Sequence, residues 1–208
     1  MAILGERDRH RIRRQRPRWG RGCLALLLAG FAASAAPAPA PAAATSSATP
    51  AVANEYQLKA VFLFNFTKYV EWPATAFADP QAPFVIGVVG DDPFGAALDD
   101  TVRGEKVNGR ALVVRRYGPK DEIKDCQILF IAATEAARLE QITAGLKGRN
   151  VLTVGDTDQF TDHGGMIWLV MENNKIRLKI NLDAAKAAKL TINSNLLRAA
   201  EVTGHSAN

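Results

Sequence analysis

The chain has 208 residues, with 26 Lys or Arg against 21 Asp or Glu and a formal net charge of +5. Residues 1–35 hold 8 Arg and 2 acidic residues, which leaves 18 basic and 19 acidic side chains in the rest of the chain. The basic excess therefore belongs to the N-terminal segment, and the remainder lacks the charge expected for binding nucleic acid or an anionic membrane.

The N-terminal segment has the order of features found in an export signal. After the arginine-rich stretch come a short apolar run at residues 23–33 and the sequence Ala33-Ser34-Ala35, which fits the A-x-A cleavage pattern. The apolar run is shorter than the roughly 20 residues that span a bilayer. We therefore expect residues 1–35 to be a cleaved signal peptide, and the mature protein to be exported without stable insertion in the membrane.

A low-complexity stretch separates this signal from the folded part of the chain. Residues 36–53 are almost entirely Ala, Pro, Ser and Thr, a composition that cannot bury enough apolar surface to offset the entropy lost on ordering. We expect a disordered linker there, a single domain of ordinary length over residues 54–203, and a tail over residues 204–208.

The folded part opens with apolar residues at helical spacing, and Pro73 ends the run. Polar side chains interrupt the run too often for a membrane span. The pattern predicts a helix packed on a sheet. Its excess aromatic surface has two open roles, which are packing in the core and contact with a partner. The apolar positions are Leu58, Val61, Phe62, Phe66, Tyr69 and Val70.

Four short apolar runs follow and predict buried strands. Their hydrophobicity is continuous rather than alternating, as in parallel strands covered on both faces. The clearest helix between them spans residues 135–147, with Thr134 as N-cap and Gly148 as terminator. This order predicts a layered α/β domain with a mostly parallel central sheet and flanking helices. The four runs are residues 84–89, 111–114, 128–131 and 151–154.

The last part of the domain predicts a C-terminal β-hairpin and two helices. Residues 166–171 and 175–180 are joined by a short Asn-rich turn. The second strand alternates apolar and basic residues, which is typical of an exposed edge strand protected by charge. One helix is expected over residues 183–190, and another from Ser194, as N-cap, to Val202. The basic positions of the edge strand are Lys175, Arg177 and Lys179.

The cysteine content excludes an intramolecular disulfide in the domain. Cys23 lies in the predicted signal, so Cys126 is the single cysteine of residues 54–203. Cys126 directly precedes the apolar run at residues 128–131. That position favours a buried, inert thiol, and a thiol available for redox chemistry is the alternative.

The sequence holds no arrangement typical of an enzyme active site. Ser194 and His163 are the one serine and the one histidine of the domain, and no nucleophile elbow or phosphate-binding glycine motif occurs. Asp156, Asp158 and Asp162 share a loop with His163, but their spacing fits neither an EF-hand nor a His-pair zinc site. We expect no catalytic residues, no cofactor and no metal.

Acidic loops follow two of the predicted strands and offer an alternative function. Asp91 and Asp92 come after the run at residues 84–89, and Asp156 follows the run at residues 151–154. Open α/β sheets bind ligands at the carboxyl ends of their strands. Asp is also a usual turn residue. Two roles stay open for these loops, which are turn formation and ligand binding in a domain that feeds a histidine kinase or a transporter.

An ordered set of short blocks carries a family resemblance. The blocks are residues 60–73, 90–95, 107–110, 126–131, 151–156, Phe160 with 164–167, and 180–182 followed by Ala184, Leu190, Ser194, Leu196 and Leu197. Together they resemble the YfiR/HmsC-like family of periplasmic proteins. The resemblance covers essentially all of residues 54–203, and its specificity lies in the ordered set rather than in any single block.

The resemblance implies a regulator rather than an enzyme. Similar proteins bind the periplasmic sensor portion of an inner-membrane diguanylate cyclase and hold it inactive, and stress releases it to raise cyclic-di-GMP and promote biofilm. Cys126 matches a family cysteine, but disulfide control is not carried over to a domain with one cysteine. Whether the protein forms a homodimer stays open. We expect an exposed hairpin region to present the contact residues Phe160, Met166, Trp168 and Glu172.

Overall fold

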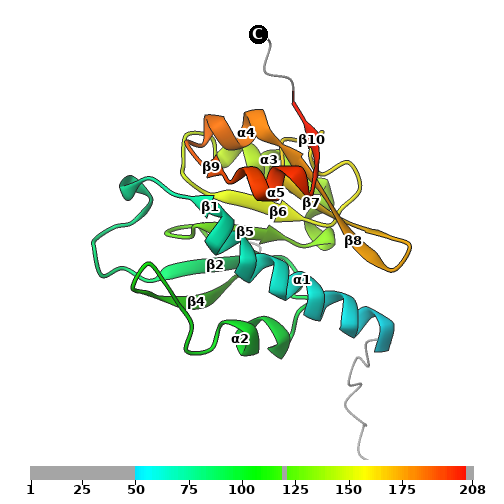
Figure 1. Cartoon of the computed structure of the whole chain (residues 1–208), viewed down its shortest axis with the longest axis horizontal. Helices are drawn as coiled ribbons and strands as arrows, with labels where there is room; N and C mark the ends of the chain where they lie inside the picture. The colour runs from blue at the N-terminus through cyan, green and yellow to red at the C-terminus, as the bar shows by residue number, and fades with distance from the viewer. Residues whose placement is uncertain (1–49, 119–120, 205–208) are drawn as a thin grey trace, which may run out of the picture. The chain divides into compact units, whose positions relative to one another are not determined.

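An eight-stranded sheet lies at the centre of the structure, a computed structural model that describes residues 50–118 and 121–204 (Figure 1). Its strands are β2 (Phe84–Val89), β3 (Lys106–Val107), β4 (Arg110–Tyr117), β5 (Ile128–Ile131), β6 (Leu152–Gly155), β7 (Ile167–Glu172), β8 (Lys175–Asn181) and β10 (Glu201–Thr203). They lie in the order β10-β8-β7-β6-β5-β2-β4-β3, and neighbours are parallel except in the pairs β3–β4 and β7–β8. The predicted layered α/β domain with a mostly parallel sheet and a C-terminal hairpin is therefore confirmed.

Helices lie on both faces of this sheet. They are α1 (Pro50–Tyr69), α2 (Ala96–Val102), α3 (Leu139–Gly145), α4 (Leu182–Ala187) and α5 (Ser194–Arg198), with 3-10 segments at Ala74–Ala76 and Ala133–Arg138. Buried residues of α1, α2, α4 and α5 share one hydrophobic core with the sheet, and those of α3 belong to a second core. A separate two-stranded sheet pairs β1 (Val70–Glu71) with β9 (Thr191–Ile192) and so fixes the end of α1.

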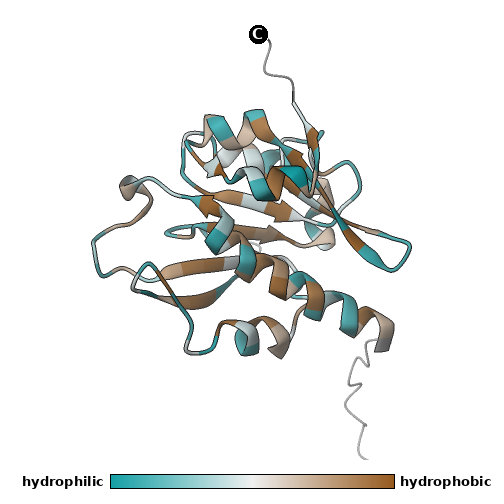
Figure 2. Ribbon diagram, in the orientation of Figure 1, coloured by the Kyte–Doolittle hydropathy of each residue, from teal (hydrophilic) through white to brown (hydrophobic). Residues whose placement is uncertain are grey.

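The three middle strands, β2, β5 and β6, are buried along their whole length. In β2, Ile86 belongs to the core shared with α1, and its neighbour Val85 to the core shared with α3. Phe130 and Leu129 of β5 alternate in the same way. Because successive side chains of a strand point to opposite faces, a strand covered on both faces needs apolar residues at nearly every position. Figure 2 shows these strands as largely hydrophobic.

Several predictions concern residues outside the described part of the chain. The predicted signal peptide at residues 1–35 and most of the predicted linker lie there, as do residues 205–208 of the predicted tail. Where the structure does describe the linker it corrects the prediction, because α1 begins at Pro50 and residues 50–53 are helical. Ala favours helices, and Pro suits the first helical turn. No helix in the described residues is long and apolar enough to cross a membrane.

The helix that the apolar spacing predicted is present as α1, but its buried face differs from the expected one. Leu58, Val61 and Tyr69 are exposed, because they lie on a different face of the helix from the buried Leu63. The helix therefore carries apolar residues on two faces, and only one of them packs on the sheet. The buried residues of α1 are Lys59, Ala60, Leu63, Phe66 and Thr67.

Two predicted helix caps are wrong. Thr134 lies inside the 3-10 segment before α3, where its Oγ1 accepts a hydrogen bond from the Asp91 N–H at 3.0 Å. Ser194 is the first residue of α5, and the cap is Asn193, whose side chain accepts from the Asn195 N–H at 2.8 Å. Ser and Asn are both good caps, so tertiary contacts decide which of the two neighbours serves at α5, whereas α3 begins after Arg138 without a side-chain cap.

The predicted hairpin is confirmed as β7 and β8, which pair antiparallel from Ile167↔Ile180 to Glu172↔Lys175. The helix expected to reach Val202 is wrong, because residues 201–203 leave α5 and pair with β8 as the parallel strand β10. β10 covers residues 179–181 of β8, so the expected exposed edge is exposed only over residues 175–178. A sheet edge offers hydrogen bonds that outweigh the weak helical preference of three residues.

Candidate interaction surface

A row of exposed apolar side chains lies along the outer side of α1. Leu58 is 43% exposed, Val61 45% and Tyr69 40%, and they recur at helical spacing on one face. Val52 in the first turns of α1 and Met171 near the hairpin turn are exposed beside them. We call these five residues the α1 surface. Among the described residues, five of the seven exposed large hydrophobic side chains belong to it, so exposed apolar area is concentrated there.

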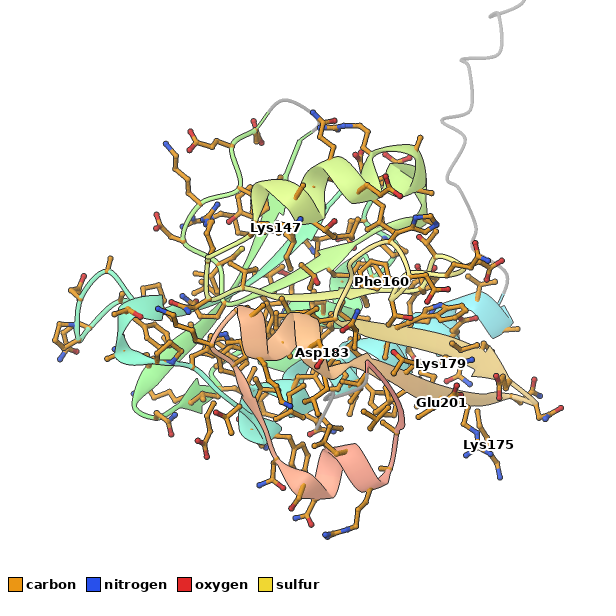
Figure 3. The ribbon with its side chains drawn as sticks, turned by 90° about the horizontal axis from the view of Figure 1, so that it is seen from above. Lys147, Phe160, Lys175, Lys179, Asp183 and Glu201 are labelled. Atoms are coloured by element: carbon orange, nitrogen blue, oxygen red, sulfur yellow. The ribbon has the colours of Figure 1, made fainter. Side chains whose placement is uncertain are left out.

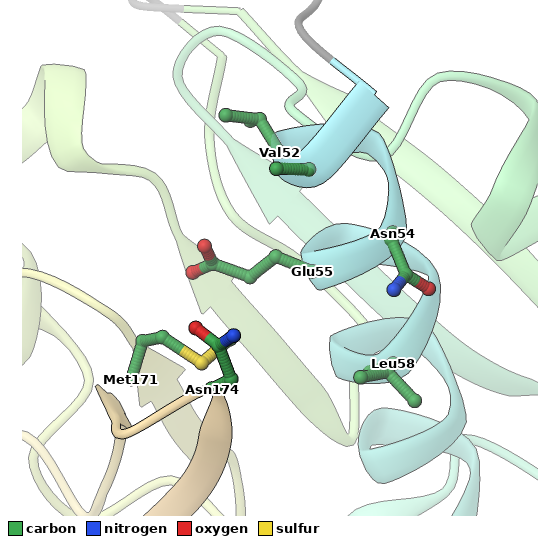
Figure 4. Close-up of a pocket in the computed structure, with 7 residues that line it drawn as sticks. Val52, Asn54, Glu55, Leu58, Met171 and Asn174 are labelled. Carbon is green, nitrogen blue, oxygen red and sulfur yellow. The ribbon is translucent and has the colours of Figure 1, made fainter.

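Two hollows open beside the α1 surface. The first, of about 230 Å³, lies between the N-terminal half of α1 and the hairpin turn. Figure 4 shows Glu55 of α1 extending toward Met171 and Asn174 of the hairpin across this hollow. The second, of about 210 Å³, lies between α1, β8 and α5. Leu58 of the first hollow and Phe62 of the second are one helical turn apart, so both open along the same side of α1.

A buried ion pair joins α1 to the carboxyl end of β6. The Lys59 ammonium is 2.6 Å from Asp156 Oδ2 and 2.5 Å from Glu55 Oε1, and its side chain is 3% exposed. The Tyr56 hydroxyl donates to the same Asp156 oxygen at 2.9 Å. Buried charges are tolerated only when they are paired, so this network fixes the position of the N-terminal half of α1.

The same network leaves two buried oxygens without a hydrogen-bond partner. They are Asp156 Oδ1 and Thr157 Oγ1, just after β6. Burial, with the negative charge of Asp156, raises the pKa of the Tyr56 hydroxyl, so Tyr56 remains a neutral donor to the carboxylate. The Asp156 carboxylate is therefore engaged inside the protein, where it anchors α1, rather than presented to solvent in the loop.

The other acidic loop, at the carboxyl end of β2, is also engaged in internal contacts. Asp92 accepts hydrogen bonds from the Phe94 N–H at 2.8 Å and from Arg116 Nε at 2.7 Å. Arg116 also holds Asp99 at 2.6 Å, and its hydrogen bond lowers the pKa of that carboxyl. Asp91 is exposed. Within the described residues, no three metal-binding side chains come together. The internal contacts of Asp92 and Asp156 support the role of turn and anchor.

The four predicted contact residues divide into two buried and two accessible side chains. Phe160 is fully buried, with its ring between Gly155 and Gly165, so the expectation that it is presented at the surface is wrong. Met166 is also buried, because it begins the strand segment that enters the core. Trp168 is half-buried under the Lys179 ammonium, 5.3 Å from its ring centre, and Glu172 is exposed beside the turn. Partner contact by Trp168 and Glu172 stays a prediction.

The match to a known family covers most of the structure described above. The model of the YfiR/HmsC-like family matches residues 56–201, from the second turn of α1 to β10. This chain belongs to the YfiR/HmsC-like family. Members of the family are regulators rather than enzymes. No curated protein matches the chain.

In this YfiR/HmsC-like protein the cysteine of the domain is buried. Cys126 lies just before β5 with 3% of its surface exposed, which confirms the predicted burial. Burial raises the pKa of its thiol to about 11, so the thiol is protonated at neutral pH and is a weak nucleophile. The neighbouring Tyr117 hydroxyl has its pKa raised to about 12, chiefly by burial and then by Cys126.

Proposed function

We propose that this protein is exported to the periplasm, where it binds the periplasmic sensor portion of an inner-membrane diguanylate cyclase and represses it. The repression limits cyclic-di-GMP and biofilm formation. The observation that carries the proposal is the family match over residues 56–201, which runs from the second turn of α1 through the hairpin to the first residue of β10.

The α1 surface supports the proposal as the place of contact. Removing apolar surface from water is worth about 25 cal/mol per Å², so exposed Leu58, Val61 and Tyr69 favour burial against another protein. The two hollows, one lined by Leu58 and the other by Phe62, can receive side chains from that partner. The buried Lys59–Asp156 pair holds the helix in place, so binding requires no ordering of α1.

The proposal is tested by deleting the gene and measuring cellular cyclic-di-GMP by mass spectrometry. Deletion should raise cyclic-di-GMP, and the full-length gene supplied on a plasmid should restore the original level. A gene lacking residues 1–35 is the matched control, because its product should stay in the cytoplasm and fail to repress. Cyclic-di-GMP levels that do not respond to deletion, together with no cyclase co-purifying with the tagged protein from membranes, would overturn the proposal.

A further inference from the structure

Half of the outer edge of β8 has no strand beside it. β10 pairs with β8 at residues 179–181, and within the described residues nothing pairs with residues 175–178 on that side. Figure 3 shows Lys179 and Glu201 together where β10 lies along β8, and Lys175 farther toward the turn. An unpaired strand edge is a ready template for another extended chain.

The turn geometry determines which backbone groups face this edge. A two-residue turn joins Glu172 to Lys175, with Asn173 and Asn174 both at positive φ. In such a hairpin the pair that flanks the turn exchanges its hydrogen bonds, and hydrogen-bonded pairs then alternate along the ladder. The N–H and C=O of Ile176 therefore point away from β7, toward the open side.

The two sides of this edge differ in chemistry. On the side that faces α1 lies the second hollow, with Leu178 in its wall and Phe62, Tyr69 and Leu196 around it. Toward the other side, Leu178 and Ala199 also line a third hollow of about 390 Å³, whose charged lining residues are Glu172, Arg177, Arg198 and Glu201.

The charge on the second side is positive overall. Glu201 is already paired with Lys179 at 3.4 Å. Among the described residues, neither Lys175 nor Arg177 has a salt-bridge partner. The guanidinium of Arg198 contacts the side-chain oxygen of Asn195, a neutral group. Lys175, Arg177 and Arg198 therefore contribute three positive charges. In this group, among the described residues, Glu172 is the one carboxylate without a salt-bridge partner.

We propose that the free edge of β8 binds an extended segment in which acidic residues alternate with apolar ones, as an added strand. Side chains of a strand alternate between faces, so the apolar residues enter the hollow beside Leu178 and the acidic residues meet Lys175 and Arg177. The identification of this segment with the periplasmic portion of a diguanylate cyclase rests on the proposed function. The recognition chemistry does not depend on it.

The first experiment uses the exported, full mature protein with a synthetic peptide of about seven residues, in which Glu alternates with Val. Hydrogen exchange should show slower exchange at the Ile176 amide when this peptide is present. A peptide of the same length in which Lys alternates with Val is the matched control, and it should bind at least about tenfold more weakly because it repels the basic side. Equal binding of the two peptides, or unchanged exchange at Ile176, would overturn the inference.

The second experiment compares variants by their affinity for the acidic peptide. Ile176→Pro removes an N–H that β7 does not use, and Arg177→Glu reverses the charge beside it. Each should weaken binding by about tenfold. Lys106→Glu on β3, at the opposite edge of the sheet, is the charge-reversal control and should bind like the wild type. If Ile176→Pro lowers the melting temperature, its weaker binding could come from unfolding, and the comparison then rests on Arg177→Glu. An Arg177→Glu variant that binds the acidic peptide with wild-type affinity would contradict the inference.

The same variants separate the inference from the proposed function. A wild-type protein that binds the cyclase while Arg177→Glu and Ile176→Pro bind it equally well would keep the proposed function and overturn binding at the β8 edge. A wild-type protein that binds the acidic peptide at Ile176 but binds no cyclase would keep the edge site and overturn the proposed partner.

Discussion

The middle of the sheet and its β7–β8 end differ in how far their strands are buried and how fully they are paired. β2, β5 and β6 are buried at every position, and each has a parallel neighbour on both sides. β4 pairs with all of β2, and β5 pairs along its whole length with both β2 and β6. At the other end, the hairpin has alternating exposure, half of its outer edge is free, and Met171 is exposed beside the α1 surface. The middle of the sheet stabilises the fold, and the hairpin end with α1 is the region that we propose binds a partner. Substitutions in the two regions should therefore have separable effects.

The largest effect on stability is expected from the buried ion pair that joins the two regions. Asp156→Ala leaves the Lys59 ammonium buried with Glu55 alone and should lower the free energy of unfolding by about 3 kcal/mol. Urea unfolding measures the change. Asp91→Ala, at an exposed carboxylate, is the control and should change stability by less than about 0.5 kcal/mol. A loss as small as the control's in Asp156→Ala would show that the pair does not anchor α1.

The free energy of unfolding should depend on pH in a way that reveals the buried thiol of Cys126. The thiol of Cys126 has a pKa of about 11 in the folded protein, above the roughly 8.5 of an unfolded cysteine. The folded state then holds the proton more tightly, so its stability is complete below the unfolded pKa and falls as the pH rises toward the folded one. Between pH 9 and pH 11 the wild type should lose about 2 kcal/mol more than Cys126→Ala. Parallel curves for the two proteins would contradict this burial.

Packing beside β6 offers the next test. A Cβ at Gly155 would lie 2.3 Å from Cε2 of Phe160, so Gly155→Ala should lower the free energy of unfolding by about 1–2 kcal/mol through overpacking. Gly145 has no atom within 4 Å of the corresponding Cβ position, and Gly145→Ala should leave stability within about 0.5 kcal/mol of the wild type. Thermal unfolding compares the two variants. Equal melting temperatures would mean that the Phe160 ring moves aside at little cost.

The smallest effect on stability belongs to the α1 surface. Leu58→Ser and Val61→Ser alter exposed side chains and should each change the free energy of unfolding by less than about 0.5 kcal/mol. In cells lacking the native gene, however, the same variants should fail to restore the low level of cyclic-di-GMP. If Leu58→Ser or Val61→Ser lowered the free energy of unfolding markedly, or restored repression as well as the wild type, the α1 surface would not be separable from the middle of the sheet.

The middle of the sheet was predictable from sequence because its signal is local. Uninterrupted apolar runs give β2 and β5 with their observed bounds, and the two asparagines of the turn give the hairpin. The helix α1 was also evident from its spacing. Its amphipathic pattern was ambiguous, because apolar residues lie on two faces, so the exposed Leu58 and Val61 could not be separated from Leu63 without the sheet.

The candidate site depends on contacts that no local pattern encodes. Lys59 and Asp156 are 97 residues apart, and nothing near either residue indicates that the other neutralises it. Phe160 follows an acidic loop and looks exposed, but the two glycines that make room for its ring become evident only in three dimensions. The exposure of Met171 could have been predicted from sequence. A large apolar residue beside an Asn-rich turn is unusual in a solvated loop and points to a contact surface.

The binding affinity of α1-surface variants tests the central claim most directly. The protein without residues 1–35 is titrated calorimetrically against the purified periplasmic domain of the proposed diguanylate cyclase partner, and Leu58→Asp is compared with Val113→Asp. Val113 is also an exposed apolar residue, but it lies on β4, away from α1 and the hairpin. We predict that Leu58→Asp weakens binding by at least about tenfold while Val113→Asp binds like the wild type. Equal affinities for the two variants would contradict the account.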